Sequence, residues 1–470
     1  MASLHTLCRI FSKAFIIVGL EWCPLVLRGS TVTKHNQTNM WLIALLLLLC
    51  AWTLHSVHPP IICRDPDVGG TAQNMERKFL IFGTDDSGGA GLGNMLIFFP
   101  AAFYFAALTG RDILIADGSV LGEMCKIIHC GFPHLRYIAP AFPRILTEDA
   151  IESAEMLKFQ DFQRYMEGSR KVESKVVRAT GFMPKSDWWI WFNFTVPCVS
   201  RITGCDPGDV MCAERHAYQR LIRGPFKSSF TAKEEERIVG VPTYLKHSLL
   251  TLPHAYSPRL DIAVHLRAQF HHFEQHTDVN DPAYRQEVSA WLNSSECEQV
   301  FGQLKEQLTQ SITVLREAKD KSKEENKLKD RDPVYIYLAS DNEDVKDAFV
   351  YMLGNTTNIL THALVMRVDS QSIYHIKNML HNSNVQSKAE GLLDLVFDWY
   401  ALSLANTVYA WRKGGTNMIS SFVQSAQKLS GRLACIIYGT EFRVHKEHTH
   451  VHMHAHVHTL MHTHIHPRHN

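Results

Sequence analysis

The sequence predicts an α/β protein made of two consecutive doubly wound domains behind one membrane-spanning helix. An apolar strand, a glycine-rich loop, an apolar helix and a second strand follow one another over residues 78–117, which is the order of a βαβ unit. Strands and helices start to alternate again at residue 260 and continue to residue 429. An uncharged apolar run over residues 40–57 precedes both units.

The composition is that of a folded protein with no preference for nucleic acid. Of the 470 residues, 46% are hydrophobic and 20% are charged, whereas a disordered chain would be charge-rich and poor in apolar residues. The 48 Lys and Arg residues nearly balance 47 Asp and Glu residues, so the net charge is +1. The chain therefore lacks the basic excess that is typical of nucleic-acid-binding proteins.

The apolar run over residues 40–57 predicts a transmembrane helix. Its 18 residues give about 27 Å of helix, close to the thickness of a secretory-pathway bilayer. Four basic residues precede it, whereas the first basic residue after it is Arg64, so residues 1–39 form a cytosolic tail and residues 58–77 a luminal stem. We expect a single-pass type II protein of the Golgi membrane. A cleaved signal peptide is the alternative, and it too would export the body of the protein.

The luminal address makes the cysteines candidates for disulfides. Eight cysteines follow the membrane helix, an even number that suits a disulfide set, with one thiol able to stay free. Residues 198–212 hold three of them together with Pro and Gly, which predicts a loop that a bridge makes rigid. Sequons for N-glycosylation at Asn193, Asn293 and Asn355 agree with this compartment.

The first domain is predicted to span residues 78–255. It begins with a strand over residues 78–83, a buried helix over residues 95–108 with Pro100 in its first turns, and a strand over residues 112–117. This order implies a parallel sheet with a right-handed crossover.

The second domain is predicted to span residues 256–444, after a hinge rich in proline. Residues 445–470 alternate His with small or apolar residues and have no pattern that could pack, which predicts a disordered tail with some affinity for transition metals. The predicted strands of this domain cover residues 260–270, 334–340, 359–368 and 407–411, and its helices lie from residue 294 onward and over residues 341–353, 391–406 and 417–429.

Glycines and acidic residues follow the first strand. Gly91 and Gly93 lie where a backbone can approach a ligand or a neighbouring chain closely, so they indicate either ligand contact or tight packing. Asn94 stands where a dinucleotide fingerprint needs Gly or Ala, which disfavours an oxidoreductase. Asp86 is a candidate acid or base, or a helix cap.

Two segments of the second domain are suited to bind an anion. His265 and Arg267 end a strand and share one face by alternation, at the edge where α/β sheets bind ligands. The guanidinium of Arg267 can grip a phosphate with two hydrogen bonds. Ser420, Ser421 and Phe422 open a helix after a glycine-rich loop and offer hydroxyl and N–H groups to an anion, or form an ordinary N-cap.

Several of these segments resemble motifs of fucosyltransferases. The Gly-Leu-Gly-Asn of residues 91–94 resembles their G-x-G-N helix opening, and residues 108–125 look most like the plant xyloglucan type. His265-Leu266-Arg267 resembles their H-x-R motif, and residues 337–346 are similar to their strand that ends in an acidic loop. Asp398 and the Ile-Ser-Ser-Phe of residues 419–422 resemble the last motif of protein O-fucosyltransferases.

The resemblance implies a GT-B fold with two Rossmann-like domains facing a cleft, the first on the acceptor side and the second binding GDP-fucose. It implies transfer of fucose with inversion to a hydroxyl group of a glycan or glycoprotein, with no metal or other cofactor. Arg267 would hold the β-phosphate with His265 beside it, and Asp398 would accept hydrogen bonds from guanine. The candidate catalytic residues are Arg267 and Asp86, of which Asp86 would be the base. The other residues placed in the donor site are Gly91, Gly93, Asn94, Asp341, Ser420, Ser421 and Phe422.

Two features depart from the resemblance. Residues 412–417 are inserted before the serine pair relative to protein O-fucosyltransferases, and the xyloglucan type has another sequence there. A second class of function stays open, namely a luminal glycan-binding protein of GT-B fold without activity. Hydrolysis of GDP-fucose distinguishes the two, because only an enzyme would catalyse it.

The topology is testable on sealed microsomes. A protease added outside should leave the body of the protein intact until detergent is added, because residues 58–470 are expected in the lumen. Digestion of the body without detergent would contradict type II topology, and a mature chain that starts beyond residue 54 would favour the signal peptide.

Overall fold

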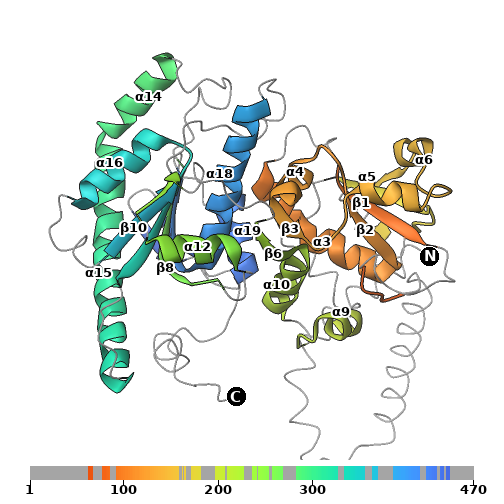
Figure 1. Cartoon of the computed structure of the whole chain (residues 1–470), viewed down its shortest axis with the longest axis horizontal. Helices are drawn as coiled ribbons and strands as arrows, with labels where there is room; N and C mark the ends of the chain where they lie inside the picture. The colour runs from red at the N-terminus through yellow and green to blue at the C-terminus, as the bar shows by residue number, and fades with distance from the viewer. Residues whose placement is uncertain are drawn as a thin grey trace, which may run out of the picture. The chain divides into compact units, whose positions relative to one another are not determined.

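Two mainly parallel sheets organise the protein, as the α/β prediction requires (Figure 1). The computed structural model describes residues 62–66, 77–84, 91–157, 161, 164–165, 171–180, 196–206, 209–226, 236–240, 242–252, 257–267, 282–326, 333–354, 363–368, 385–412, 420–430, 434–438 and 441–444. The predicted tail, membrane helix and His-rich segment therefore lie outside the described residues, as do most residues of the predicted stem.

The first sheet has the order β2-β1-β5-β4, and all its pairs are parallel. The predicted βαβ unit is confirmed, because α3 (Leu92–Thr109) connects two parallel neighbours. The four strands are β1 (Lys78–Thr84), β2 (Arg111–Ile115), β4 (Glu155–Leu157) and β5 (Val176–Thr180).

Helix α3 forms the core of this part of the molecule. It is the one helix among the described residues that is long and apolar enough to cross a membrane, and 94% of its apolar window is buried inside the protein. It begins at Leu92, earlier than predicted, so Pro100 lies in mid-helix rather than in the first turns. Gly110 ends it in the left-handed conformation, with a φ of 64°.

The second sheet has the order β13-β12-β11-β8-β9-β10-β7. Its five inner strands are parallel, and antiparallel strands flank them on both edges. Chain order runs outward from β8 in both directions, which is the doubly wound arrangement. The strands are β7 (Ile238–Val239), β8 (Leu260–Arg267), β9 (Val334–Ser340), β10 (Ala363–Val368), β11 (Ala405–Arg412), β12 (Ala434–Tyr438) and β13 (Glu441–Val444).

Both faces of this sheet are covered by helices. Figure 1 shows α14 (Pro282–Leu292), α15 (Ser295–Asn326) and α16 (Glu343–Gly354) on one side, and α18 (Val385–Leu404) on the other. Because both faces are covered, β8 is buried almost throughout, including its polar residues Asp261 and His265. Its residues 262, 264 and 266 pack in the core with α14–α16, so residues 263, 265 and 267 face the other side.

The shorter elements complete the chain. The remaining pair is antiparallel, between β3 (Ile128–Cys130) and β6 (Ile222–Phe226). The other helices are α4 (Val120–Ile127), α5 (Leu135–Ile138), η2 (Ala139–Ala141), α6 (Glu148–Glu152), α9 (Val196–Thr203), α10 (Val210–Leu221), α12 (Thr243–Thr251) and α19 (Ser421–Ser430).

Three disulfides lie among the described residues, and the helices around one of them correct a prediction. The disulfides join Cys63 to Cys198, Cys125 to Cys130 and Cys205 to Cys212, while Cys297 is buried and free. The predicted loop over residues 198–212 is wrong for most of its length, since α9 and α10 occupy both ends. Only the turn between them is irregular, because Gly204 adopts a φ of 71° and the Asp209 side chain caps α10.

Residues 62–66, predicted as part of the stem, are attached to the end of α3. The backbone N–H groups of Ile62 and Arg64 donate to the carbonyls of Leu108 and Ala107 at 3.0 Å each. Arg64 also forms an ion pair with Asp112. The predicted domain boundary at residue 255 stays a prediction; β7, which precedes it, pairs with β10 of the second sheet.

Candidate functional site

Two motifs that are far apart in the sequence meet at the end of β8. Arg267 is the last residue of β8, and Ser420 immediately precedes α19. Arg267 donates a hydrogen bond from Nη1 to the Ser420 hydroxyl oxygen at 3.1 Å, across a separation of 153 residues. Residues 412–417, which are inserted relative to protein O-fucosyltransferases, therefore do not keep Ser420 away from Arg267.

The position of Arg267 is where a doubly wound sheet binds ligands. The strand order of the second sheet reverses at β8, with β9 and β10 on one side and β11 and β12 on the other. In open α/β sheets, ligands bind beyond the carboxyl ends of the strands at this switch point. Asp341 follows β9 at the same edge, because its neighbour Ser340 pairs with Leu266.

His265 lies on the same face of β8 as Arg267, as strand alternation predicts. Its ring centroid lies 5.8 Å from that of Phe422, and the residue is only 6% exposed. Burial, and secondarily the charge of Arg267, lowers the pKa of His265 to about 3. The imidazole is therefore neutral at physiological pH and shapes the site without adding charge to it.

The glycine motif of the first domain reaches the same place. A Cβ atom on Gly93 would lie 2.3 Å from the backbone nitrogen of Phe422, so only glycine allows α3 to approach α19 this closely. Gly91 is the N-cap of α3 and has an extended backbone without a side-chain cap. Asn94, in the first turn, donates its backbone N–H to the Gly91 carbonyl at 3.0 Å.

Two helix N-termini thus meet beside an arginine. A helix N-terminus carries unsatisfied N–H groups and a partial positive charge, and both favour a bound anion. Ser421 is the first residue of α19, so its hydroxyl lies in the first turn. The combination of α3, α19, Arg267 and Ser420 has the chemistry of a phosphate site.

Asp398 lies deeper on the same face of the sheet, within a network of buried polar groups. Tyr337 of β9 pairs with Ala263 and donates a short hydrogen bond to the Asp398 carboxylate. Burial raises the pKa of Asp398 to about 6, and the charge of Lys346 opposes this shift. Lys346 is 1% exposed and bonds Glu343 Oε2 at 2.9 Å and the Val368 carbonyl at 2.7 Å.

The sequence alone did not identify the partners of Asp398, which are Tyr337, Glu343 and Lys346. One feature of the sequence indicated such a partner. Lys346 interrupts an otherwise apolar stripe of α16 that is formed by Val345, Phe349 and Leu353. Lysine is almost never fully buried unless it is paired, so its position in this stripe indicated a buried partner.

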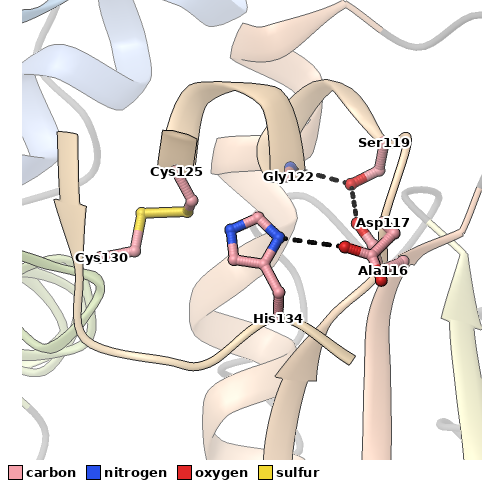
Figure 2. Close-up of a disulfide and its surroundings, with 7 residues drawn as sticks. All are labelled: Ala116, Asp117, Ser119, Gly122, Cys125, Cys130 and His134. Atoms are coloured by element: carbon pink, nitrogen blue, oxygen red, sulfur yellow. Dashed lines mark hydrogen bonds and ion pairs between the residues drawn. A yellow bond between two sulfur atoms is a disulfide. The ribbon is translucent and has the colours of Figure 1, made fainter. Parts of the chain in front are cut away.

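A second polar cluster lies at the carboxyl end of β2 (Figure 2). His134 Nδ1 lies 3.3 Å from Asp117 Oδ1, and the backbone N–H of Arg136 donates to Asp117 Oδ2 at 2.8 Å. Ser119 caps α4, whose last turn is linked to β3 by the Cys125–Cys130 disulfide. The candidate base Asp86 lies outside the described residues, so its role stays a prediction.

Comparison with known proteins finds distant similarity to solved structures only. No family model and no curated protein matches the sequence. The chain is similar to NodZ α-1,6-fucosyltransferase soaked with GDP-fucose, at 13% identity and a TM-score of 0.39, over 79% of this chain and 99% of that one. It is similar to Arabidopsis thaliana FUT1 in complex with GDP, at 14% identity and a TM-score of 0.40, over 79% of this chain and 72% of that one. NodZ from Bradyrhizobium matches at 14% identity and a TM-score of 0.35, over 75% of this chain and 92% of that one. These similarities are distant, with TM-scores of 0.35 to 0.40 and identities of 13% to 14%.

Gly93→Ala tests whether the close approach of α3 and α19 forms the site. The added methyl group cannot fit against the Phe422 backbone, so the two N-termini must move apart. We expect affinity for GDP, measured by calorimetry, to fall by about tenfold or more, since sub-ångström misplacement of a binding group is costly. Gly302→Ala is the matched control, because a Cβ there meets nothing within 4 Å. Unchanged GDP affinity in a folded Gly93→Ala variant would contradict this site.

Asp398→Asn tests the buried carboxylate through the pH dependence of stability. The folded-state pKa, about 6, lies above the ordinary 3.8, so the protonated group stabilises the fold at low pH and this contribution is lost as pH rises through 6. The variant should therefore melt above the wild type at pH 8, keep about half of this advantage at pH 5 and lose it below about pH 3.8, while binding GDP more weakly at pH 8. A melting difference that does not vary with pH would show that Asp398 has an ordinary pKa.

Proposed function

We propose that this protein is an inverting fucosyltransferase that uses GDP-fucose as donor and a hydroxyl group of a glycan or glycoprotein as acceptor. The hydrogen bond between Arg267 and Ser420 carries the proposal, because it joins the two motifs that the resemblance assigns to the donor phosphates. The proposal includes a Golgi location, type II topology and independence from metal ions.

The arrangement suits departure of a nucleoside diphosphate. Breaking the sugar–phosphate bond builds negative charge on the leaving diphosphate, which must be stabilised more in the transition state than in the bound donor. Arg267 and the N-termini of α3 and α19 supply fixed positive charge for this purpose. Such preorganised groups are typically worth about 3–4 kcal/mol each, or roughly 10² to 10³ in rate.

The remaining donor contacts belong to the guanosine. We propose that the Asp398 carboxylate accepts hydrogen bonds from the guanine base and that Asp341 lines the nucleotide pocket. The acceptor hydroxyl must lose a proton, and Asp86, in the loop between β1 and α3, is the proposed base. The sequence position of Asp86, six residues before the first residue of α3, supports this choice.

The alternative is a glycan-binding protein of the same fold without activity. It would keep the fold but would not need a functional donor site. Release of GDP from GDP-fucose, with water as acceptor, separates the two proposals, and it should proceed in the presence of EDTA.

Arg267→Lys is the decisive variant. Lysine keeps the charge but replaces a planar fork by a point ammonium, so a bidentate grip on phosphate is lost. If Arg267 holds the phosphate, we expect the rate of GDP release to fall by about 10² or more. If Arg267 were only a solvated surface charge, the change would be worth less than about 1 kcal/mol. The control is Arg316→Lys on α15, an arginine in a partly exposed ion pair with Asp320, which should have no effect. A stable Arg267→Lys variant with wild-type turnover would overturn the assignment.

A further inference from the structure

A buried ion pair joins α19 to α10 at the end of α19 away from the donor site. Lys428 Nζ lies 2.7 Å from Glu214 Oε1, and the two residues are 214 positions apart in the sequence. The side chains of Lys428 and Glu214 are only 9% and 5% exposed. Nothing in the motifs or in the proposed chemistry accounts for this pair.

Stability alone is a poor reason for such a pair. Two charges leave water when it forms, and replacing a buried pair by apolar side chains of similar volume is often neutral or stabilising. Removing one partner, in contrast, leaves an uncompensated buried charge. What a buried pair provides, and an apolar contact does not, is a fixed direction and distance between two elements.

Helix α10 is in turn fixed to α3 by two tyrosine hydroxyl groups. Tyr104 of α3 donates to the Ala213 carbonyl at 2.7 Å, and Tyr218 of α10 donates to the Leu96 carbonyl at 2.8 Å. Both tyrosines are fully buried. The geometry of α10 is therefore set by the same helix whose N-terminus forms part of the donor site.

The three helices form a closed triangle. Tyrosines join α3 to α10, the Glu214–Lys428 pair joins α10 to α19, and the Gly93–Phe422 approach joins α19 to α3. A hydrogen bond from Trp399 to Ser425, at 2.9 Å, also holds the middle of α19. The ion pair links the far end of α19 to α10, where Ala426 and Leu429 are also buried.

We propose that Glu214 and Lys428 are positioning residues, which hold α19 so that Ser420 and Phe422 stay in place at the end of β8. The proposal rests on the proposed function for its consequence, which is tighter binding of the donor nucleotide. Neither residue touches the donor. Without the pair, only apolar packing among the described residues, which fixes no direction, holds the last turn of α19 against α10, so the helix can shift and the Ser420 hydroxyl can move away from Arg267.

The test compares single and double variants. Lys428→Met and Glu214→Leu should each lower the melting temperature and weaken GDP binding by about tenfold, within the range typical of coupling between distant sites. The double variant, with an apolar contact, should recover the melting temperature while GDP affinity stays low. The control is Glu123→Gln with Lys126→Met, which removes an exposed ion pair on α4. Recovery of both properties in the double variant, or wild-type GDP affinity in folded single variants, would overturn the proposal.

Hydrogen exchange separates failure of this proposal from failure of the proposed function. Lys428→Met should accelerate exchange of the backbone amides of residues 424 and 425, the first of which donates to the Ser420 carbonyl at 3.0 Å. If the wild type does not bind GDP, the proposed function is wrong, and the exchange data still decide the positioning role. Unchanged exchange at these amides would reject it.

Discussion

The proposed donor site depends on one steric constraint, the absence of a side chain at Gly93. With any Cβ there, the backbones of α3 and α19 could not meet, and the N-terminus of α3 would stand away from Arg267 and Ser420. The contact places the positive ends of two helices and a guanidinium in one region. Like charges repel, so this arrangement is electrostatically unfavourable when empty and is relieved by an anion, which is the property a diphosphate site requires.

The buried groups around this region keep its charge in one place. His265 is held neutral by burial, so among the described residues of β8 the positive charge at its carboxyl end resides on Arg267. Asp398 sits deeper, where burial raises its pKa and Lys346 limits the rise. The two ends of the site thus have different characters: fixed positive charge at the helix N-termini, and a hydrogen-bond-accepting carboxylate farther along the sheet.

The sequence predicted the parts of this fold that follow from local pattern. β9 was predicted over residues 334–340 and lies there, because both faces of the strand are covered and it reads as an apolar run. Alternation placed His265 and Arg267 on one face of β8. The sequence could not predict that Gly93 touches Phe422 or that Glu214 pairs with Lys428, because such contacts depend on tertiary packing. The loop over residues 198–212 was mispredicted because Gly and Pro suggested irregular structure along its whole length, whereas only its middle is irregular.

The central claim is that the end of β8 binds a guanosine diphosphate, and calorimetric titration tests it most directly. The purified luminal body, with its disulfides intact and without added metal, should bind GDP at one site and bind UDP much more weakly. The difference follows from Asp398, whose carboxylate can accept hydrogen bonds from the N–H groups of guanine but not from the smaller uracil at the same distance. No heat of binding with GDP, or equal affinity for GDP and UDP, would contradict the account.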